Sequence, residues 1–150
     1  MDNPEKLLEQ INQYYINYFR FDAVYYKWAA LHEIKDTTLF ILERIYYFPD
    51  GCSQKYLCET LSYPKQTISA ALTRLEKSGY IHRQKEPDDF RGNVILLTED
   101  GRRKAEQVVG GMRAAELEAF AAMSEEERTV VARGLQVLAD RLDESFGKIL

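Results

Sequence analysis

The sequence has few of the residues that build metal sites, disulfide frameworks or membrane spans. No apolar run approaches the roughly 18 residues of a membrane span, and the acidic, polar N-terminus does not resemble a secretory signal. We therefore expect a cytoplasmic protein, in which a structural disulfide between Cys52 and Cys58 is not expected. The two cysteines lack nearby partner ligands, because His32 and His82 are both distant in sequence, so no zinc site is expected either.

Signals for catalysis are also missing. The two histidines accompany no nucleophile or carboxylate motif, and no glycine-rich loop is present that could cradle a phosphate. We expect no enzyme activity, no catalytic residues, no cofactor and no metal.

The charge of the chain is slightly negative overall but uneven along its length. A net charge of −4 argues against a generally basic, nucleic-acid-coating protein. Residues 55–91, however, hold seven basic against five acidic side chains, whereas residues 1–50 and 99–150 are each acidic by three charges. The excess positive charge therefore lies in the middle of the chain, which gives weak support for a DNA contact there.

The outer parts of the chain predict long helices. Asn3 is a suitable N-cap for a first helix that begins at Pro4, follows an apolar periodicity through Leu31 and bends near residues 20–22. A second helix is expected over about 35–48. Thr98 caps a long helix with a possible kink at Gly110-Gly111. A capping box at residues 124–127 begins the last helix, whose apolar stripe suits packing against another helix: Val131, Leu135, Leu138, Leu142, Phe146 and Ile149.

The middle of the chain predicts a compact reading module. Ser53 caps a short helix over 54–61, a turn at 62–64 follows, and a second helix over 64–78 ends at Gly79. Two strands, 80–85 and 93–97, flank a polar loop at 86–92. This order is typical of a winged helix-turn-helix, in which the second helix enters the DNA major groove and the hairpin lies beside it.

The helix expected over 64–78 has two chemically different faces. A helical wheel groups Ile68, Ala71, Leu72 and Leu75 on one side, which predicts the buried face. The other side and its flanks carry no bulky aliphatic residue, so they fit a groove about 12 Å wide. They comprise Lys65, Gln66, Thr67, Ser69, Ala70, Thr73 and Arg74. A solvated helix face is the alternative interpretation, but the preceding helix and the following hairpin favour DNA binding.

Individual roles follow from side-chain chemistry. Gln66, near the helix N-terminus, can pair with an adenine edge, and Ala70 can meet a thymine methyl group. Lys65, Thr67, Ser69 and Arg74 are better placed for phosphates. Ser53, with the free backbone N–H groups that follow it, offers a further phosphate site. Thr73 on the same helix and Lys85 in the wing complete this part of the candidate surface.

The stretch from Asp89 to Gly101 resembles the Asp-x-Arg … Leu-Thr-x-x-Gly signature of the MarR family of bacterial transcription regulators. Upstream, Thr67-Ile68-Ser69 and residues 75–81 resemble the recognition helix of that family and its exit into the wing. The resemblance implies a homodimer with a triangular body built by the terminal helices, and two winged modules on palindromic DNA. It also implies that Arg91 inserts into the minor groove while Asp89 steadies it. A guanidinium on a narrow tip independently suits the negative minor groove.

Two features are candidates for regulation, which the resemblance also implies. Eight aromatic residues fall within residues 14–28, and Tyr18, Tyr25 and Trp28 with His32 could line a pocket for a small planar ligand. We favour a tyrosine-rich dimer interface over this pocket. Cys52 lies beside a helix N-terminus, where a thiolate is stabilised, so a redox response is a further hypothesis, although no resolving cysteine is evident.

Together these observations predict a mainly α-helical protein with a small β-hairpin wing. The expected regions are an N-terminal dimerisation helix region over 1–34, a winged helix-turn-helix over 35–98 and C-terminal dimerisation helices over 99–150, joined in one integrated domain. The expected function is a homodimeric, sequence-specific repressor of palindromic operators, relieved by a small ligand. A winged-helix protein-interaction module and a thiol-based redox-responsive regulator remain alternatives.

Overall fold

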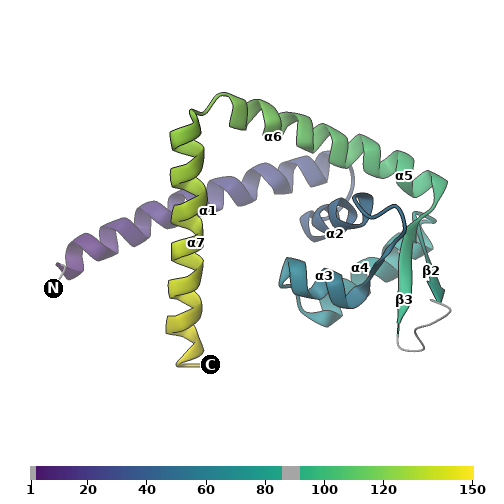
Figure 1. Ribbon diagram of the computed structural model, residues 1–150, viewed down its shortest axis with the longest axis horizontal. Helices are drawn as coiled ribbons and strands as arrows, with labels where there is room; N and C mark the ends of the chain where they lie inside the picture. Colours follow the sequence, from purple (N-terminus) through teal and green to yellow (C-terminus); the bar gives the residue numbers. More distant parts are fainter. Residues whose placement is uncertain (1–2, 86–91) are drawn as a thin grey trace. The chain divides into compact units, whose positions relative to one another are not determined.

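A computed structural model describes residues 3–85 and 92–150 (Figure 1). The chain divides into two compact units, Met1–Met112 and Arg113–Leu150. In chain order the elements are α1 (Pro4–Leu31), α2 (Asp36–Tyr46), β1 (Cys52–Ser53), α3 (Gln54–Leu61), α4 (Lys65–Lys77), β2 (Ile81–Lys85), β3 (Asn93–Leu97), α5 (Glu99–Ala105), the π-helical turn η1 (Glu106–Gly110), α6 (Gly111–Ala121) and α7 (Glu125–Gly147). None of the described helices combines the length and the apolarity that crossing a membrane requires.

Helix α1 begins where its cap predicts. The side chain of Asn3 accepts a hydrogen bond from the backbone N–H of Glu5 (3.0 Å), and Pro4 occupies the first helical position. No break accompanies the bend expected near residues 20–22, because the helix is continuous from Pro4 to Leu31. Residues 20–22 contain neither proline nor glycine, so nothing in the local sequence breaks the hydrogen-bond ladder.

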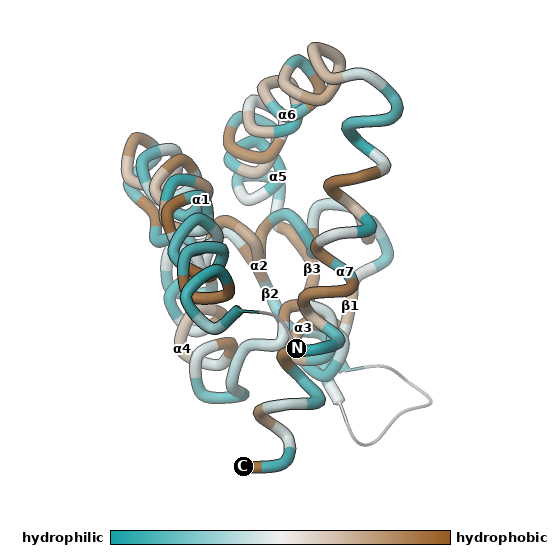
Figure 2. The backbone as a smooth tube through the Cα atoms, turned by 90° about the vertical axis from the view of Figure 1, so that its left-hand side faces the viewer, coloured by the Kyte–Doolittle hydropathy of each residue, from teal (hydrophilic) through white to brown (hydrophobic). Residues whose placement is uncertain are grey.

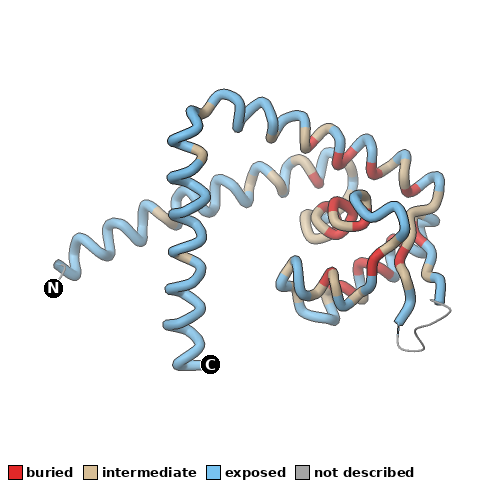
Figure 3. The backbone as a smooth tube through the Cα atoms, in the orientation of Figure 1, coloured by how far each residue is buried: buried red, intermediate tan, exposed pale blue. Residues whose placement is uncertain are grey.

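Helix α2 is the centre of the first unit. It contacts α1, α3, α4, α5, η1 and β3, and four of its apolar side chains are almost completely buried: Leu39, Ile41, Leu42 and Ile45. Figure 3 shows buried positions concentrated in α2 and in the elements around it. The helix-turn-helix and the sheet are therefore built around one shared core, which fixes α3, α4 and the strands relative to each other.

The sheet has one strand more than the expected hairpin. Strands β2 and β3 form the expected antiparallel hairpin, with Ile81 opposite Leu97. Strand β1 adds to the other edge of β3, with Cys52 opposite Ile95. Gly51, at φ +89°, makes this addition possible, because a Cβ there would lie 2.1 Å from the Val94 side chain. The order is β1-β3-β2.

The predicted disturbance at Gly110-Gly111 takes the form of a π-helical turn. Residues 106–110 form η1 between α5 and α6. The indole N–H of Trp28 donates to the carbonyl of Val108 (3.0 Å), and a Cβ on Gly111 would lie 2.8 Å from the Trp28 ring. The large side chain of Trp28 thus packs directly against this turn.

The second unit is dominated by α7, which begins with the predicted capping box. Ser124 and Glu127 exchange side-chain-to-backbone hydrogen bonds of 3.1 and 2.8 Å. No residue of α7 is buried. Within α7, Leu138 of the apolar stripe is half-buried and the other members are exposed, from Leu142 at 38% to Phe146 at 56%. Brown apolar positions recur along the helix in Figure 2.

Candidate nucleic-acid interface

The helix-turn-helix forms with the boundaries that its capping residues predict. The Ser53 hydroxyl accepts from the backbone N–H of Tyr56 (3.0 Å) at the start of α3, so Ser53 is engaged with its own helix terminus. Ser62 then adopts a left-handed conformation (φ 54°) that turns the chain before Pro64. Gly79, at φ 75°, ends the α4 region.

Helix α4 presents the two faces that the helical wheel predicts. Ile68, Ala71, Leu72 and Leu75 are at most 3% exposed and belong to the core shared with α2 and α3. The opposite side is open to solvent: Lys65, Gln66, Ala70, Thr73 and Arg74 are exposed, while Thr67 and Ser69 on its flanks are half-buried. The candidate contact residues on α4 therefore share one accessible surface.

A polar contact joins this surface to α3. The Gln54 side-chain amide donates to the Ser69 hydroxyl (3.2 Å), and the Thr73 hydroxyl donates to the Ser69 carbonyl (3.0 Å). Sequence reasoning did not single out Gln54. Its place just after the Ser53 cap was visible, but the contact between residues 54 and 69 depends on how α3 packs on α4.

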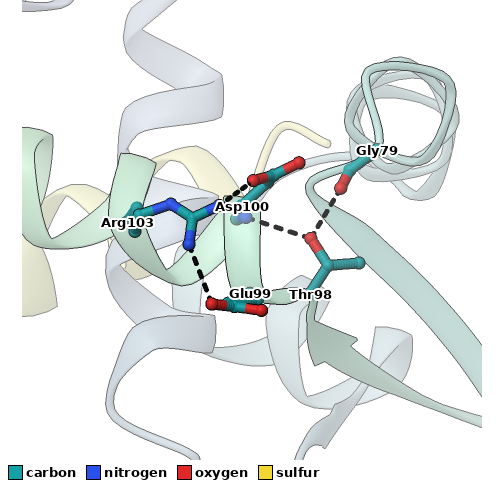
Figure 4. Close-up of polar contacts among 6 residues, drawn as sticks. Gly79, Thr98, Glu99, Asp100 and Arg103 are labelled. Atoms are coloured by element: carbon teal, nitrogen blue, oxygen red, sulfur yellow. Dashed lines mark hydrogen bonds and ion pairs between the residues drawn. The ribbon is translucent and has the colours of Figure 1, made fainter.

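The base of the wing is held by Thr98 (Figure 4). Its hydroxyl donates to the carbonyl of Gly79 and accepts from the backbone N–H of Gly101 (3.0 Å). Its own backbone N–H donates to the carbonyl of Tyr80 (3.0 Å). Thr98 therefore caps α5 and at the same time ties α5 to the segment that leads from α4 into β2.

Gly101 explains the spacing of the Leu-Thr-x-x-Gly pattern. A Cβ at this position would lie 1.8 Å from the carbonyl oxygen of Tyr80, so only glycine allows α5 to pass this close. Glu99 and Asp100 pair with Arg103 on the exposed side of the same turn. The pattern thus positions the wing relative to α4 through backbone contacts.

The wing strands carry few free cations within the described residues. Lys85, at the end of β2, is exposed. Arg83 on β2 lies 3.5 Å from the carboxylate of Glu76 on α4, and this ion pair joins the wing to α4. Asp89 and Arg91, the expected minor-groove pair, lie outside the described residues.

Of the four expected ligand-pocket residues, Trp28 and His32 contact each other directly. Tyr25 and Trp28 on α1 and His32 at its C-cap are half-buried. Trp28 makes an edge contact with His32 (ring centroids 4.5 Å apart), whereas Tyr25 packs on Phe40 of α2 (5.2 Å). The Nε2 atom of His32 is buried and has no hydrogen-bond partner among the described residues. Tyr18 is 49% exposed and instead contacts Tyr14 and Phe19.

The stabilised thiolate expected at Cys52 is wrong. The side chain is 7% exposed and belongs to the core, and burial raises the pKa of its thiol to about 11. Desolvation of the charged form therefore outweighs any attraction from the α3 N-terminus. Cys58 is half-buried and packs against the same core. Within residues 3–85 and 92–150, no group of three or more potential ligands could hold a metal ion.

Residues 32–92, which contain α2, the helix-turn-helix and β2, match the model of the MarR family. The whole fold agrees with that match. The chain is similar to NMB1585, a MarR family regulator from Neisseria meningitidis, with 23% identity, coverage of 94% of this chain and 99% of that chain, and a TM-score of 0.79. The match to the MarR family model thus covers residues 32–92, and the chain shares the fold of a MarR family regulator.

Other MarR structures share the fold. An S. aureus MepR–DNA complex is 21% identical, with coverage of 95% and 99% and a TM-score of 0.70. Streptococcus pneumoniae FabT in complex with DNA is 22% identical, with coverage of 95% and 99% and a TM-score of 0.66. At these identities the similarity of the two structures to this chain shows a shared fold and no more.

Two proteins of Bacillus subtilis (strain 168) are similar to this chain in sequence. YwhA, an uncharacterized HTH-type transcriptional regulator, is 36% identical over 70 residues, which are 47% of this chain and 50% of the relative. YdgJ, also an uncharacterized HTH-type transcriptional regulator, is 28% identical over 105 residues, 70% of this chain and 63% of the relative. The matches thus span between half and just under two thirds of these relatives.

Proposed function

We propose that this chain is a homodimeric, sequence-specific DNA-binding transcription regulator of the MarR family that represses palindromic operators and is released by a small ligand. The observation that carries the proposal is the accessible face of α4, which is small, polar and basic, beside a wing held by Thr98. Such a face fits the major groove. Two solved structures with this fold, S. aureus MepR and Streptococcus pneumoniae FabT, are complexes with DNA, and family members are regulators rather than enzymes.

The residues divide by the part of DNA that they contact. Gln66 and Ala70 face bases because they are exposed in the first two turns of α4, and Thr73 is exposed one turn further along the helix. The residues that contact phosphates in this proposal are Ser53, Lys65, Thr67, Ser69, Arg74 and Lys85. Arg91, steadied by Asp89, enters the minor groove, a role that rests on the sequence resemblance alone.

Dimerisation would cover the apolar side chains that each unit leaves in water. Residues 1–34 and 99–150 supply the dimer body in this proposal, and residues 35–98 bind DNA. Large apolar side chains of α1 and α7 are exposed, among them Ile11, Phe19, Leu135 and Phe146. Soluble proteins rarely leave so much apolar surface uncovered without a partner.

The ligand part of the proposal rests on α1. Trp28 and His32 form a half-buried ring pair, Tyr25 is half-buried on the same helix, and the unpartnered Nε2 of His32 offers a polar group for a small planar molecule. Tyr18, exposed beside Tyr14 and Phe19, belongs in this proposal to the tyrosine-rich dimer interface.

Selection of bound duplexes from a randomised pool tests the function. The proposal predicts an inverted repeat with half-sites about one helical turn apart, and binding that weakens steeply as salt rises. A protein-interaction module would select no duplex. Gln66→Ala should relax base preference at one position of each half-site, whereas an unchanged preference would contradict its role in base recognition.

A further inference from the structure

We propose that Gln54 is a positioning residue for DNA recognition, which holds the Ser69 hydroxyl as a hydrogen-bond donor toward a phosphate oxygen. The inference rests on the proposed DNA-binding function and adds to it a residue outside α4. Gln54 is the first residue of α3, and its amide nitrogen lies 3.2 Å from the Ser69 oxygen. Both side chains are half-buried where α3 meets α4.

The amide nitrogen of Gln54 sets the direction of the contact, because an amide NH2 group can only donate. A serine hydroxyl has one proton to donate and two lone pairs to accept with. One lone pair of Ser69 accepts the Gln54 amide proton, and within the described residues its own proton is donated to no group. The neighbouring carbonyl is also occupied, because the Thr73 hydroxyl donates to it. What Ser69 offers outward is therefore an O–H donor.

The place of Ser69 on α4 favours a phosphate over a base. Ser69 lies on the flank between the buried side, with Ile68, and the exposed side, with Gln66 and Ala70. A short, half-buried side chain on a flank meets the rim of the major groove, where the backbone runs. Phosphate oxygens only accept hydrogen bonds, so an oriented hydroxyl donor suits them. If the Gln54 amide were removed, the hydroxyl would be free to rotate, and part of the contact energy would be lost in ordering it.

A double-mutant cycle on the selected duplex tests the inference. Fluorescence anisotropy would measure the affinities of wild type, Gln54→Met, Ser69→Ala and the double variant. Ser69→Ala should bind DNA about tenfold more weakly than wild type, because it loses a hydrogen bond from a neutral hydroxyl to a charged phosphate. Gln54→Met should bind about threefold more weakly. If Gln54 acts through Ser69, the double variant binds like Ser69→Ala alone. Gln136→Met, on the exposed surface of α7, serves as the matched control and should bind like wild type.

Three readouts separate positioning from a general structural role. Urea unfolding of each variant shows whether the loss of affinity exceeds the loss of stability. The slope of log affinity against log salt should be unchanged, because Gln54 and Ser69 are both neutral. Base preference in a repeated selection should also be unchanged. Gln54→Glu provides a second variant, because its carboxylate would accept a hydrogen bond from the Ser69 hydroxyl. It should bind DNA more weakly than Gln54→Met. The difference in affinity between these two variants should become smaller when both also carry Ser69→Ala.

Each contrary result has a distinct meaning. If Gln54→Met weakens binding equally with and without the Ser69 hydroxyl, Gln54 does not act through Ser69 and the inference is overturned. If Ser69→Ala changes base preference at one position, Ser69 contacts a base and the phosphate assignment is wrong. If wild type binds no duplex, the proposed function fails together with the inference that rests on it.

Discussion

At Gly101 a single missing side chain decides how the wing joins the helices. An added Cβ would lie 1.8 Å from the Tyr80 oxygen and 2.6 Å from its carbonyl carbon, and both atoms belong to the backbone. We expect Gly101→Ala to lower the free energy of unfolding by about 3 kcal/mol, because the backbone must shift to relieve the clash. Thermal or urea unfolding measures this.

Gly134 is the matched control for that substitution. It lies within α7, where a Cβ would meet no atom within 4 Å. Gly134→Ala should therefore leave stability unchanged or raise it by about 0.5–1 kcal/mol through helix propensity. Equal stability of the two variants would show that the close approach of α5 to Tyr80 is not required.

Cys52 makes the stability of the fold sensitive to alkaline pH. Burial raises the pKa of its thiol from 9.0 to about 11, so the native state keeps the proton at pH values where the unfolded chain releases it. The stabilisation is therefore complete below about pH 9 and is lost as pH rises through about 11. The pKa of Tyr63 is also raised, by burial and by Asp36, and it adds to the loss in the same direction.

The variant Cys52→Ala isolates this effect. Urea unfolding at about pH 8 and about pH 10 should show a smaller alkaline loss of stability in Cys52→Ala than in wild type, with the remainder due to groups such as Tyr63. The difference between the two pH values is the relevant quantity, since the smaller side chain lowers stability at both. An identical alkaline loss in the two proteins would refute the buried, protonated thiol.

At the scale of elements, the π-helical turn is shaped by Trp28. Two adjacent glycines differ in their surroundings: a Cβ on Gly111 would lie 2.8 Å from the Trp28 ring, whereas a Cβ on Gly110 would meet nothing within 4 Å. We expect Gly111→Ala to lower the free energy of unfolding by about 1–3 kcal/mol through overpacking, and Gly110→Ala to raise it by up to about 1 kcal/mol.

Urea unfolding measures the stability of both variants, and tryptophan fluorescence measures the surroundings of Trp28 in each. Trp28 is the chain's single tryptophan, so its emission reports directly on this contact. Gly111→Ala should alter the emission and Gly110→Ala should not. The account of this turn would be wrong if both variants were equally stable and spectrally alike.

Helix boundaries were largely predictable because capping is local. Asn3, Ser53 and Ser124 each mark a helix start through contacts within three residues. The exposed side and the buried side of α4 were also predictable from local sequence, because helical periodicity assigns each residue to one of them. Strand β1 was missed because it has two residues and exists only by pairing with β3, more than 40 positions away.

The site was predictable where it depends on one helix and not where it depends on packing. The exposed residues of α4 follow from the wheel, but the contact of Gln54 with Ser69 joins two helices. Cys52 shows the opposite error: its place beside a helix terminus suggested a thiolate, while the core around it, contributed by distant elements, raises its pKa.

At the scale of the whole molecule, the proposed homodimer would cover the exposed stripe of α7. Leu135 is 53% exposed and Val131 41% exposed on a helix with no buried residue. We expect Leu135→Lys to weaken self-association by tenfold or more, because a charge would be buried at the helix contact, and to weaken operator binding with it. Sedimentation velocity measures the first effect and anisotropy the second.

Gln136→Lys adds the same charge at an exposed position outside the stripe and controls for it. It should associate like wild type. If Leu135→Lys remained fully associated, the stripe would not be part of the subunit contact.

The most direct test of the account is the stoichiometry of the complex between the full chain and its selected duplex, measured by sedimentation velocity at low salt. The account predicts two copies of the chain on each inverted repeat, with binding lost as salt is raised. A single subunit that binds no double-stranded DNA, even at low salt, would contradict it.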